Sequence, residues 1–267
     1  MMTPKAQGPP AQLIAMLEPA RLSTTDWEVL TSGAERAARQ WMENKHQASG
    51  ACLLVLINGC LQCPEPTLAA AKLLLASQEL EHAQTFRHRQ NQAHHLLARA
   101  GLRLLLAAIT GEPPQQLAIE RSPTGKPFLA RSEAREHSPE FNIAHSHDLV
   151  LIGLHHTDPI GVDLEAHRPL PDCLAIAKRC FDGETVRQLA ALNGEQQLHA
   201  FYSAWCQLEA DRKATGHGLA RTPPAQIELQ RLPIAVPVDY SGWVSILPEK
   251  RIATLARRSF TSSSSEI

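Results

Sequence analysis

The sequence predicts an α+β fold made of two subdomains, because strand-like and helix-like segments occur in two consecutive runs. In the first run, an apolar strand-like segment at 52–58 precedes helical periodicity from 67 to 109. In the second run, strand-like segments at 141–146, 149–154 and 160–165 precede helical patterning at 174–192 and 195–215. A last strand-like segment lies at 242–247. We expect 149–154 and 160–165 to form a hairpin around Thr157.

The 267 residues and their 43% hydrophobic content are sufficient for two such units. We place an N-terminal extension at 1–48, a first α+β half at 49–137 and a second half with a metal site at 138–250. The final segment, 251–267, contains a run of serines and is expected to be a flexible tail.

Charge and hydropathy exclude several classes of protein. The 26 basic and 27 acidic residues give a net charge of -1, which argues against general nucleic-acid binding. No apolar stretch approaches the roughly 20 residues that cross a bilayer, and no secretory segment is visible, so we expect a cytoplasmic protein that is not bound to a membrane. Six cysteines are too few for a disulfide-stapled secreted scaffold.

Basic residues mark the first half. Arg87, Arg89, Arg99 and Arg103 lie beside a leucine-rich helical face, and the simplest interpretation is a solvated basic face. The turn at 122–127, rich in proline and glycine, is expected to present Lys126 from an exposed loop.

Asp163 and Glu165 are two residues apart in a strand-like segment. Alternate residues of a strand share a face, so the two carboxylates converge while Val162 and Leu164 pack behind them. Paired carboxylates repel unless a cation lies between them, and hard oxygen ligands suit Mg²⁺. The alternative is an exposed polar strand edge.

Two further clusters are chemically suggestive. Glu209 and Lys213 are four apart on a predicted helix, where a surface ion pair worth ~0.3–0.5 kcal/mol is the alternative to a catalytic role. His145 and His147 follow a strand and are either structural or, with Asp163, part of a zinc site in a hydrolase.

Taken in order, these segments resemble the motifs of the 4'-phosphopantetheinyl transferases, in the larger, surfactin-activator-like class. The motifs are Gly125-Lys126-Pro127, Phe141-Asn-Ile-Ala-His-Ser146, Gly161-Val-Asp-Leu-Glu165 and Trp205-Cys-Gln-Leu-Glu-Ala-Asp-Arg-Lys-Ala-Thr-Gly-His-Gly-Leu219. The resemblance covers about residues 52 to 247. It implies two similar α+β halves related by a pseudo-twofold axis, with the active site in the cleft between them and no second copy needed, so we expect a monomer.

The resemblance also implies the reaction and the roles of the residues. The protein would transfer the 4'-phosphopantetheine group of coenzyme A to a serine of an apo carrier protein of a fatty-acid, polyketide or peptide synthase, and release 3',5'-ADP. Asp163, Glu165 and Glu209 would bind Mg²⁺, and Lys213 would contact the pyrophosphate. Lys126 and His145 would hold coenzyme A through its phosphates and adenosine end. For the base that accepts the serine proton, we select Glu209.

The sequence departs from the family pattern at three places. Leu208 stands where the family has a lysine before the metal-binding glutamate, and Arg212, four residues on, is expected to restore that charge. Ala144 replaces a serine before the motif histidine. In the first half, the stretch 77–85 lacks the family's basic residues, and we expect Arg87 or Arg89 to substitute for them. The alternatives are a non-catalytic homologue that binds coenzyme A or carrier protein, and the zinc hydrolase.

Overall fold

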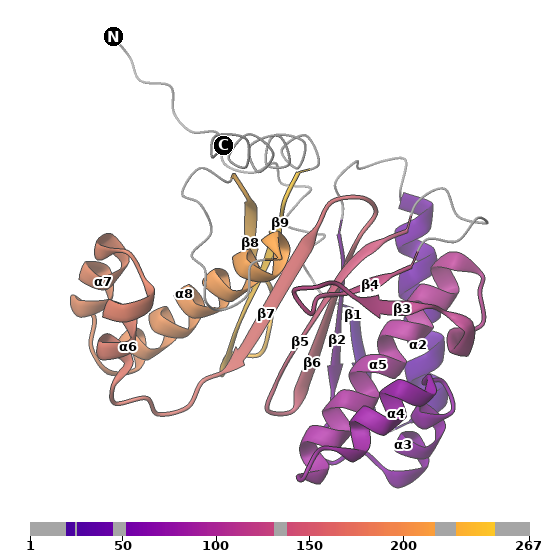
Figure 1. Cartoon of the computed structure of the whole chain (residues 1–267). Coiled ribbons are helices and arrows are strands. Elements are labelled where there is room, and N and C mark those ends of the chain that lie inside the picture. Colours follow the sequence, from indigo (N-terminus) through magenta and orange to yellow (C-terminus); the bar gives the residue numbers. More distant parts are fainter. Residues whose placement is uncertain (1–19, 25, 45–51, 131–137, 217–227, 249–267) are drawn as a thin grey trace, which may run out of the picture.

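The first half of the protein is a four-stranded sheet with helices packed against it (Figure 1). The computed structural model describes residues 20–24, 26–44, 52–130, 138–216 and 228–248. The strand order is β1-β2-β6-β5, in which β1 is parallel to β2 and the other pairs are antiparallel. The strands are β1 (Ala20–Ser23), β2 (Leu53–Asn58), β6 (Leu149–His155) and β5 (Glu140–Ser146).

The helices of the first half form one layer. Helix α5 (Arg89–Thr110) is its centre, with α2 (Trp27–Glu43), α3 (Glu65–Lys72) and α4 (Ser77–Gln84) packed around it. Its left-handed cap at Gly111, where φ is 75°, ends the helix, because glycine adopts this conformation without strain. A short 3₁₀ turn (Pro114–Gln116) leads to the hairpin of β3 (Ile119–Arg121) and β4 (Pro127–Leu129).

The second half is a three-stranded antiparallel sheet covered by one long helix. Its order is β7-β9-β8, with β7 at Ile160–Ala166, β9 at Tyr240–Ile246 and β8 at Gln230–Pro233. Helix α8 (Gly194–Thr215) packs on β7 and β9, on the side of the strands away from α2–α5 (Figure 1). Helices α6 (Cys173–Cys180) and α7 (Gly183–Ala190) close over an aromatic cluster of Phe181, Phe201 and Trp205.

The predicted two-halved α+β fold is confirmed, but the predicted hairpin is wrong. Strand β6 pairs with β2 and β5, whereas β7 pairs with β9. Every residue of β6 is buried, so it is a central strand that needs a partner on each edge, and an apolar pattern does not say which partners. The four-stranded sheet also takes strands from both sides of residue 138.

The halves meet along β5 and β7, which are joined by side chains. The Asn142 side-chain oxygen accepts a hydrogen bond from the Val162 amide at 3.0 Å. At the other end, the Ser146 hydroxyl accepts one from the Ala166 amide at 3.0 Å. These bonds hold β7 beside the first sheet, and the two strands carry motif residues along one seam.

Part of the predicted N-terminal extension lies in the core. Strand β1 extends the first sheet, and α2 buries Leu30, Ala38 and Trp41 against α5 and the sheet. The loose helical spacing of this segment therefore marks a packed helix, because its apolar stripe covers the helix layer. The tail at 251–267, the start of the chain at 1–19 and motif residues 217–219 lie outside the described residues.

The basic helix face is also different from the prediction. Arg103 is buried, with its side chain 1% exposed, and its Nε donates to Glu79 at 2.7 Å. Arg99 is partly buried, with its side chain 12% exposed, and lies 3.9 Å from the same carboxylate. These two arginines therefore hold α4 against α5, and they are not available as a solvated face.

In the part of the chain that the structure describes, no helix combines the length and the apolar character of a membrane span.

Candidate active site

Strand β7 carries the two predicted carboxylates. Val162 and Leu164 are buried in the core, so Asp163 and Glu165 share the opposite face of the strand, as the spacing predicts. Asp163 is only 6% exposed. The Ser146 hydroxyl donates to the Glu165 carboxylate at 2.9 Å, which ties the end of β5 to this face.

A close contact between α8 and β7 adds the helix residues to the site. A Cβ atom at Gly161 would lie 2.1 Å from the Ala210 carbonyl oxygen, so only glycine permits this approach of the two backbones. The Lys213 ammonium consequently reaches β7, donating to Asp163 Oδ1 at 2.7 Å and to the Val162 carbonyl at 3.1 Å.

The electrostatic state of the carboxylates follows from their burial. Desolvation raises the pKa of Asp163, and the Lys213 ammonium opposes this effect. Desolvation likewise raises the pKa of Glu165, which the Ser146 hydrogen bond opposes and the Asp163 charge reinforces. Asp163 Oδ2 is buried without a hydrogen-bond partner among the described residues. An unpartnered oxygen beside a second carboxylate is an arrangement that a cation stabilises.

Glu209 lies one turn before Lys213 but has a different partner. Its Oε1 accepts from Arg212 at 2.8 Å, and both side chains are nearly buried. Within the described chain, the recorded ion pair of Lys213 is with Asp163, so the simple surface pair between Glu209 and Lys213 is not formed. Arg212 Nε is buried and has no partner there.

Lys126 also reaches β7, but at the opposite end from Glu165. Its ammonium donates to the Ile160 carbonyl at 3.2 Å and lies 3.7 Å from the Glu140 carboxylate. Its side chain is 17% exposed, less than expected for an exposed loop, and burial lowers its pKa. The β3–β4 turn therefore spans the seam between the halves.

His145 lies near the end of β5 and is exposed. Its ring stacks on His94 of α5, with 5.3 Å between ring centroids and 14° between planes. Desolvation, His94 and the Lys213 ammonium lower the pKa of His145. Arg87 is exposed in the segment between α4 and α5.

Sequence reasoning did not select three residues that shape this site: His94, Ser146 and Gly161. Gly161 and Ser146 stood inside recognised motifs, where an unexplained small residue signals a close contact. His94 had no such signal, because one histidine in a helix is not distinguished from any other. Among the described residues, no group of three or more histidine, cysteine or acidic side chains is close enough to hold a metal.

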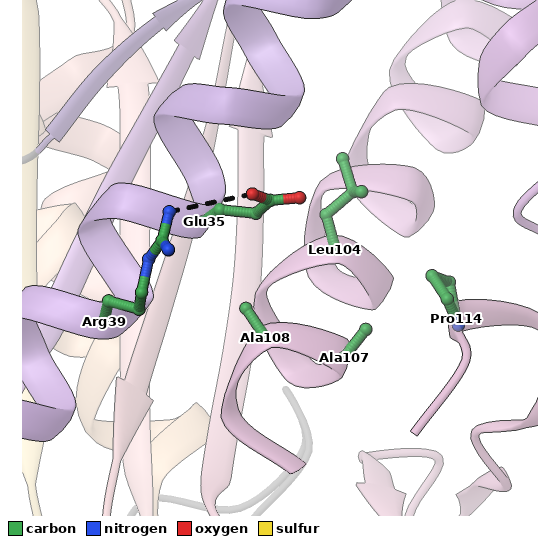
Figure 2. A pocket seen from close by; sticks show the side chains of 6 residues that line it. All are labelled: Glu35, Arg39, Leu104, Ala107, Ala108 and Pro114. Carbon is green, nitrogen blue, oxygen red and sulfur yellow. Dashed lines mark ion pairs between the residues drawn. The ribbon is translucent and has the colours of Figure 1, made fainter. Parts of the chain in front are cut away.

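Two hollows flank helix α5. One, of about 360 Å³, lies between α2 and α5 and contains one exposed ion pair, between Glu35 and Arg39 (Figure 2). The other, of about 600 Å³, lies between α4, α5 and the β3–β4 hairpin. Its lining includes His82, His95, Arg99, Arg121 and Pro127.

Comparison with known proteins is consistent with this arrangement. The sequence profile of the 4'-phosphopantetheinyl transferase superfamily matches residues 159–257, and that of the N-terminal region of 4'-phosphopantetheinyl transferases matches residues 63–156. The two profiles divide between β6 and β7, where the sheets divide.

Several relatives carry the same name. The chain is 34% identical over 169 residues to the 4'-phosphopantetheinyl transferase HetI of Nostoc sp., covering 63% of this chain and 71% of HetI. It is 41% identical over 160 residues to a Synechocystis sp. protein named for the same activity, covering 59% of this chain and 64% of that protein. It is 30% identical over 138 residues to the 4'-phosphopantetheinyl transferase psf-1 of Bacillus pumilus, covering 52% and 56%. With this coverage, these motifs and this two-halved fold, the chain belongs to the 4'-phosphopantetheinyl transferase superfamily.

Proposed function

We propose that the protein transfers the 4'-phosphopantetheine group of coenzyme A to a serine of an apo carrier protein and releases 3',5'-ADP, in a magnesium-dependent reaction. The observation that carries the proposal is the contact of α8 with β7. This contact brings Lys213 of α8 onto Asp163 of β7, and it supports a site in which Glu165 on the same strand and Glu209 on the same helix also take part. The names of the relatives point to the same chemistry.

The chemistry of the donors around Asp163 suits Mg²⁺, because carboxylates supply hard oxygen ligands and Asp163 Oδ2 is buried without a partner in the described chain. Asp163 and Glu165 would hold the ion together with Glu209, whose carboxylate now pairs with Arg212 and would have to turn toward Asp163, since the three do not form a ready metal cluster among the described residues. The Lys213 ammonium, 2.7 Å from Asp163 Oδ1, supports the assignment of a positively charged ligand to this position. When bound, Mg²⁺ would supply charge neutralisation for the pyrophosphate.

The protein's own groups position the reactants and move one proton. Lys213 would turn from Asp163 to the coenzyme A pyrophosphate and stabilise the charge that develops on the leaving phosphate. Glu209 would accept the proton of the carrier serine while the serine oxygen bonds to the β-phosphorus of coenzyme A. The bond from that phosphorus to the bridging oxygen breaks at the same time, and this oxygen leaves with 3',5'-ADP. Arg212, 2.8 Å from Glu209, would supply the cation that Leu208 does not.

Coenzyme A would lie along the seam, from the carboxylates past His145 toward Lys126. The 600 Å³ hollow beside the β3–β4 hairpin is our candidate for the adenosine end, because Arg121 in its lining offers a positive charge to a phosphate group. Its lining also contains Glu120 and the pair of Glu79 with Arg99. Arg87, exposed between α4 and α5, would add a further positive charge to phosphate binding.

We further propose that the protein acts as a cytoplasmic monomer, with coenzyme A and an apo carrier protein as its partners and without nucleic acid or membrane. One chain supplies both sides of the seam, so the site needs no second copy. The net charge of -1 supports a soluble enzyme with local basic pockets over a nucleic-acid binder.

The test combines purified protein, Mg²⁺, coenzyme A and an apo carrier protein, and reads the carrier's intact mass. We expect the addition of one phosphopantetheine group, its loss with EDTA and its return with excess Mg²⁺. Glu209→Gln should slow the addition at least about 100-fold. The matched control is Glu195→Gln, an exposed glutamate in the first turn of the same helix, which should retain the rate. No addition on fatty-acid, polyketide or peptide-synthetase carriers would overturn the proposal.

A further inference from the structure

A buried imidazole lies beneath His145. His94 projects from α5 into the protein and is only 5% exposed, yet its Nε2 has no hydrogen-bond partner within the described parts of the chain. Buried polar atoms are nearly always hydrogen-bonded, so an exception needs an explanation. Helix α5 is otherwise leucine- and alanine-rich on this face, and an apolar side chain would pack there without leaving an orphaned nitrogen.

The stacked rings of His94 and His145 extend from the core to the surface, and we call this pair of rings the column. The rings are nearly parallel at 14°, with 5.3 Å between centroids, so the position of the exposed His145 ring depends on His94. The backbone of His147, in the β5–β6 turn, raises the pKa of His94, so the His94 ring lies next to this turn. That turn is anchored in its own right, since the Asp148 carboxylate accepts from the Gly59 and Leu61 amides at 3.1 and 2.7 Å.

The surroundings of the column disfavour the protonated form of both rings. Desolvation lowers the pKa of His94, and the His147 ring acts in the same direction, whereas the His147 backbone and the Asp148 carboxylate oppose them. For His145, desolvation, His94 and the α8 ammonium of Lys213 all lower the pKa. Two protonated rings this close would also repel each other. An incoming anion reverses this balance, because it attracts a proton onto the column.

We propose that His94 is a positioning residue for coenzyme A, which fixes the His145 ring and takes up a proton with it when a phosphate group of the ligand binds at His145. This inference rests on the proposed function, since it deepens the role of His145 there. It predicts that coenzyme A binding is linked to proton uptake and weakens as the pH rises through the range where the ligand-bound column loses its proton.

The test is calorimetric titration of the full-length protein with coenzyme A, without carrier, between pH 5.5 and 8.5 in buffers of different ionisation heat. The variant is His94→Asn, which removes the ring and Nε2 and keeps a polar side chain next to the His147 backbone. We expect binding about tenfold weaker at pH 6 and at most about twofold weaker at pH 8.5, with less proton uptake. His199→Asn, an exposed histidine of α8 that lies in a different ring cluster, is the matched control and should behave as the wild type.

Titration of the phosphate groups of coenzyme A is common to all three proteins, so the comparison isolates the column. An unchanged pH profile and proton count in His94→Asn would overturn the inference and leave the proposed function standing. No coenzyme A binding by the wild type at any pH would overturn the proposed function itself. Should the variant not fold, NMR titration of the wild-type histidine ring protons with and without coenzyme A decides, because equal proton affinity in both states would refute the inference.

Discussion

Gly161 is the point at which the predicted site depends most directly on backbone geometry. A Cβ there would lie 2.1 Å from the Ala210 carbonyl oxygen and 2.4 Å from the Ala214 amide nitrogen. Both are backbone atoms inside α8, so neither is able to rotate away. Gly161→Ala therefore has to move the helix off β7. In an unconstrained strand position, the same substitution would be neutral or slightly stabilising, because alanine restricts the unfolded chain.

The size of the effect follows from these distances. To reach ordinary contact, the helix backbone has to retreat by about 1 Å or more at this point. Such overpacking costs about 3 kcal/mol of the free energy of unfolding, which lowers the Tm by roughly 6–12 °C for a protein of this size. A shift of about 1 Å also withdraws Glu209 and Lys213 from Asp163, and misplacement on this scale reduces the transfer rate about 100-fold.

The assay pairs urea unfolding with carrier modification followed by intact mass. The matched control is Gly242→Ala in β9, where the added Cβ meets the Val236 side chain at 3.0 Å, a methyl group that is able to shift. We expect the control to lose less than about 1 kcal/mol and to retain activity. If Gly161→Ala is as stable and as active as the control, then α8 and β7 are not in the close contact on which the site depends.

Two further predictions concern the first half. Glu79→Gln leaves Arg103, whose side chain is 1% exposed, without its ionic partner, and should lower the free energy of unfolding in urea by about 3 kcal/mol. The control is Glu184→Gln in an exposed ion pair, which should cost less than about 0.5 kcal/mol. Equal effects of the two substitutions would contradict a buried ion pair. Burial and the neighbouring Arg99 lower the pKa of His95 to about 4, so between pH 6.5 and 4 the unfolded chain holds a proton that the folded protein lacks, and stability falls as the pH falls through this window. His95→Gln should flatten that fall in the free energy of unfolding, and an unchanged slope would refute the assignment.

Much of the secondary structure could be predicted from the sequence, because apolar patterns and turn residues act locally and do not depend on tertiary contacts. The apolar runs at 53–57 and 149–154 are buried strands, and α8 spans 194–215 against a predicted 195–215. Partners of strands were not readable, since the apolar pattern of β6 fits a hairpin with β7 as well as a central strand between β2 and β5. The predicted helical run from 67 to 109 is three helices, because short turns after α3 and α4 interrupt it.

The burial of charged residues could not be predicted from the sequence either. Arg103 and Arg89 look equivalent in sequence, yet Arg103 is buried on Glu79 and Arg89 forms an exposed pair with Glu65. Which arginine is buried depends on where α4 lies against α5. A periodic pattern identifies a helix face, but it does not identify what the face touches.

By itself, the sequence determined the family, the two-halved α+β class and the chemical types at the site, since motif wording and strand periodicity are local properties of the chain. Only the tertiary structure decided which residues are in contact: Lys213 donates a hydrogen bond to Asp163, Arg212 donates one to Glu209, Lys126 donates one to a carbonyl of β7, and the His94 ring stacks on His145. Three of these contacts join residues of different elements. The fourth, between Arg212 and Glu209, lies within α8, where Glu209 contacts Arg212 and not Lys213. The physical reason is that packing sets such distances: α8 is able to approach β7 only where Gly161 has no side chain.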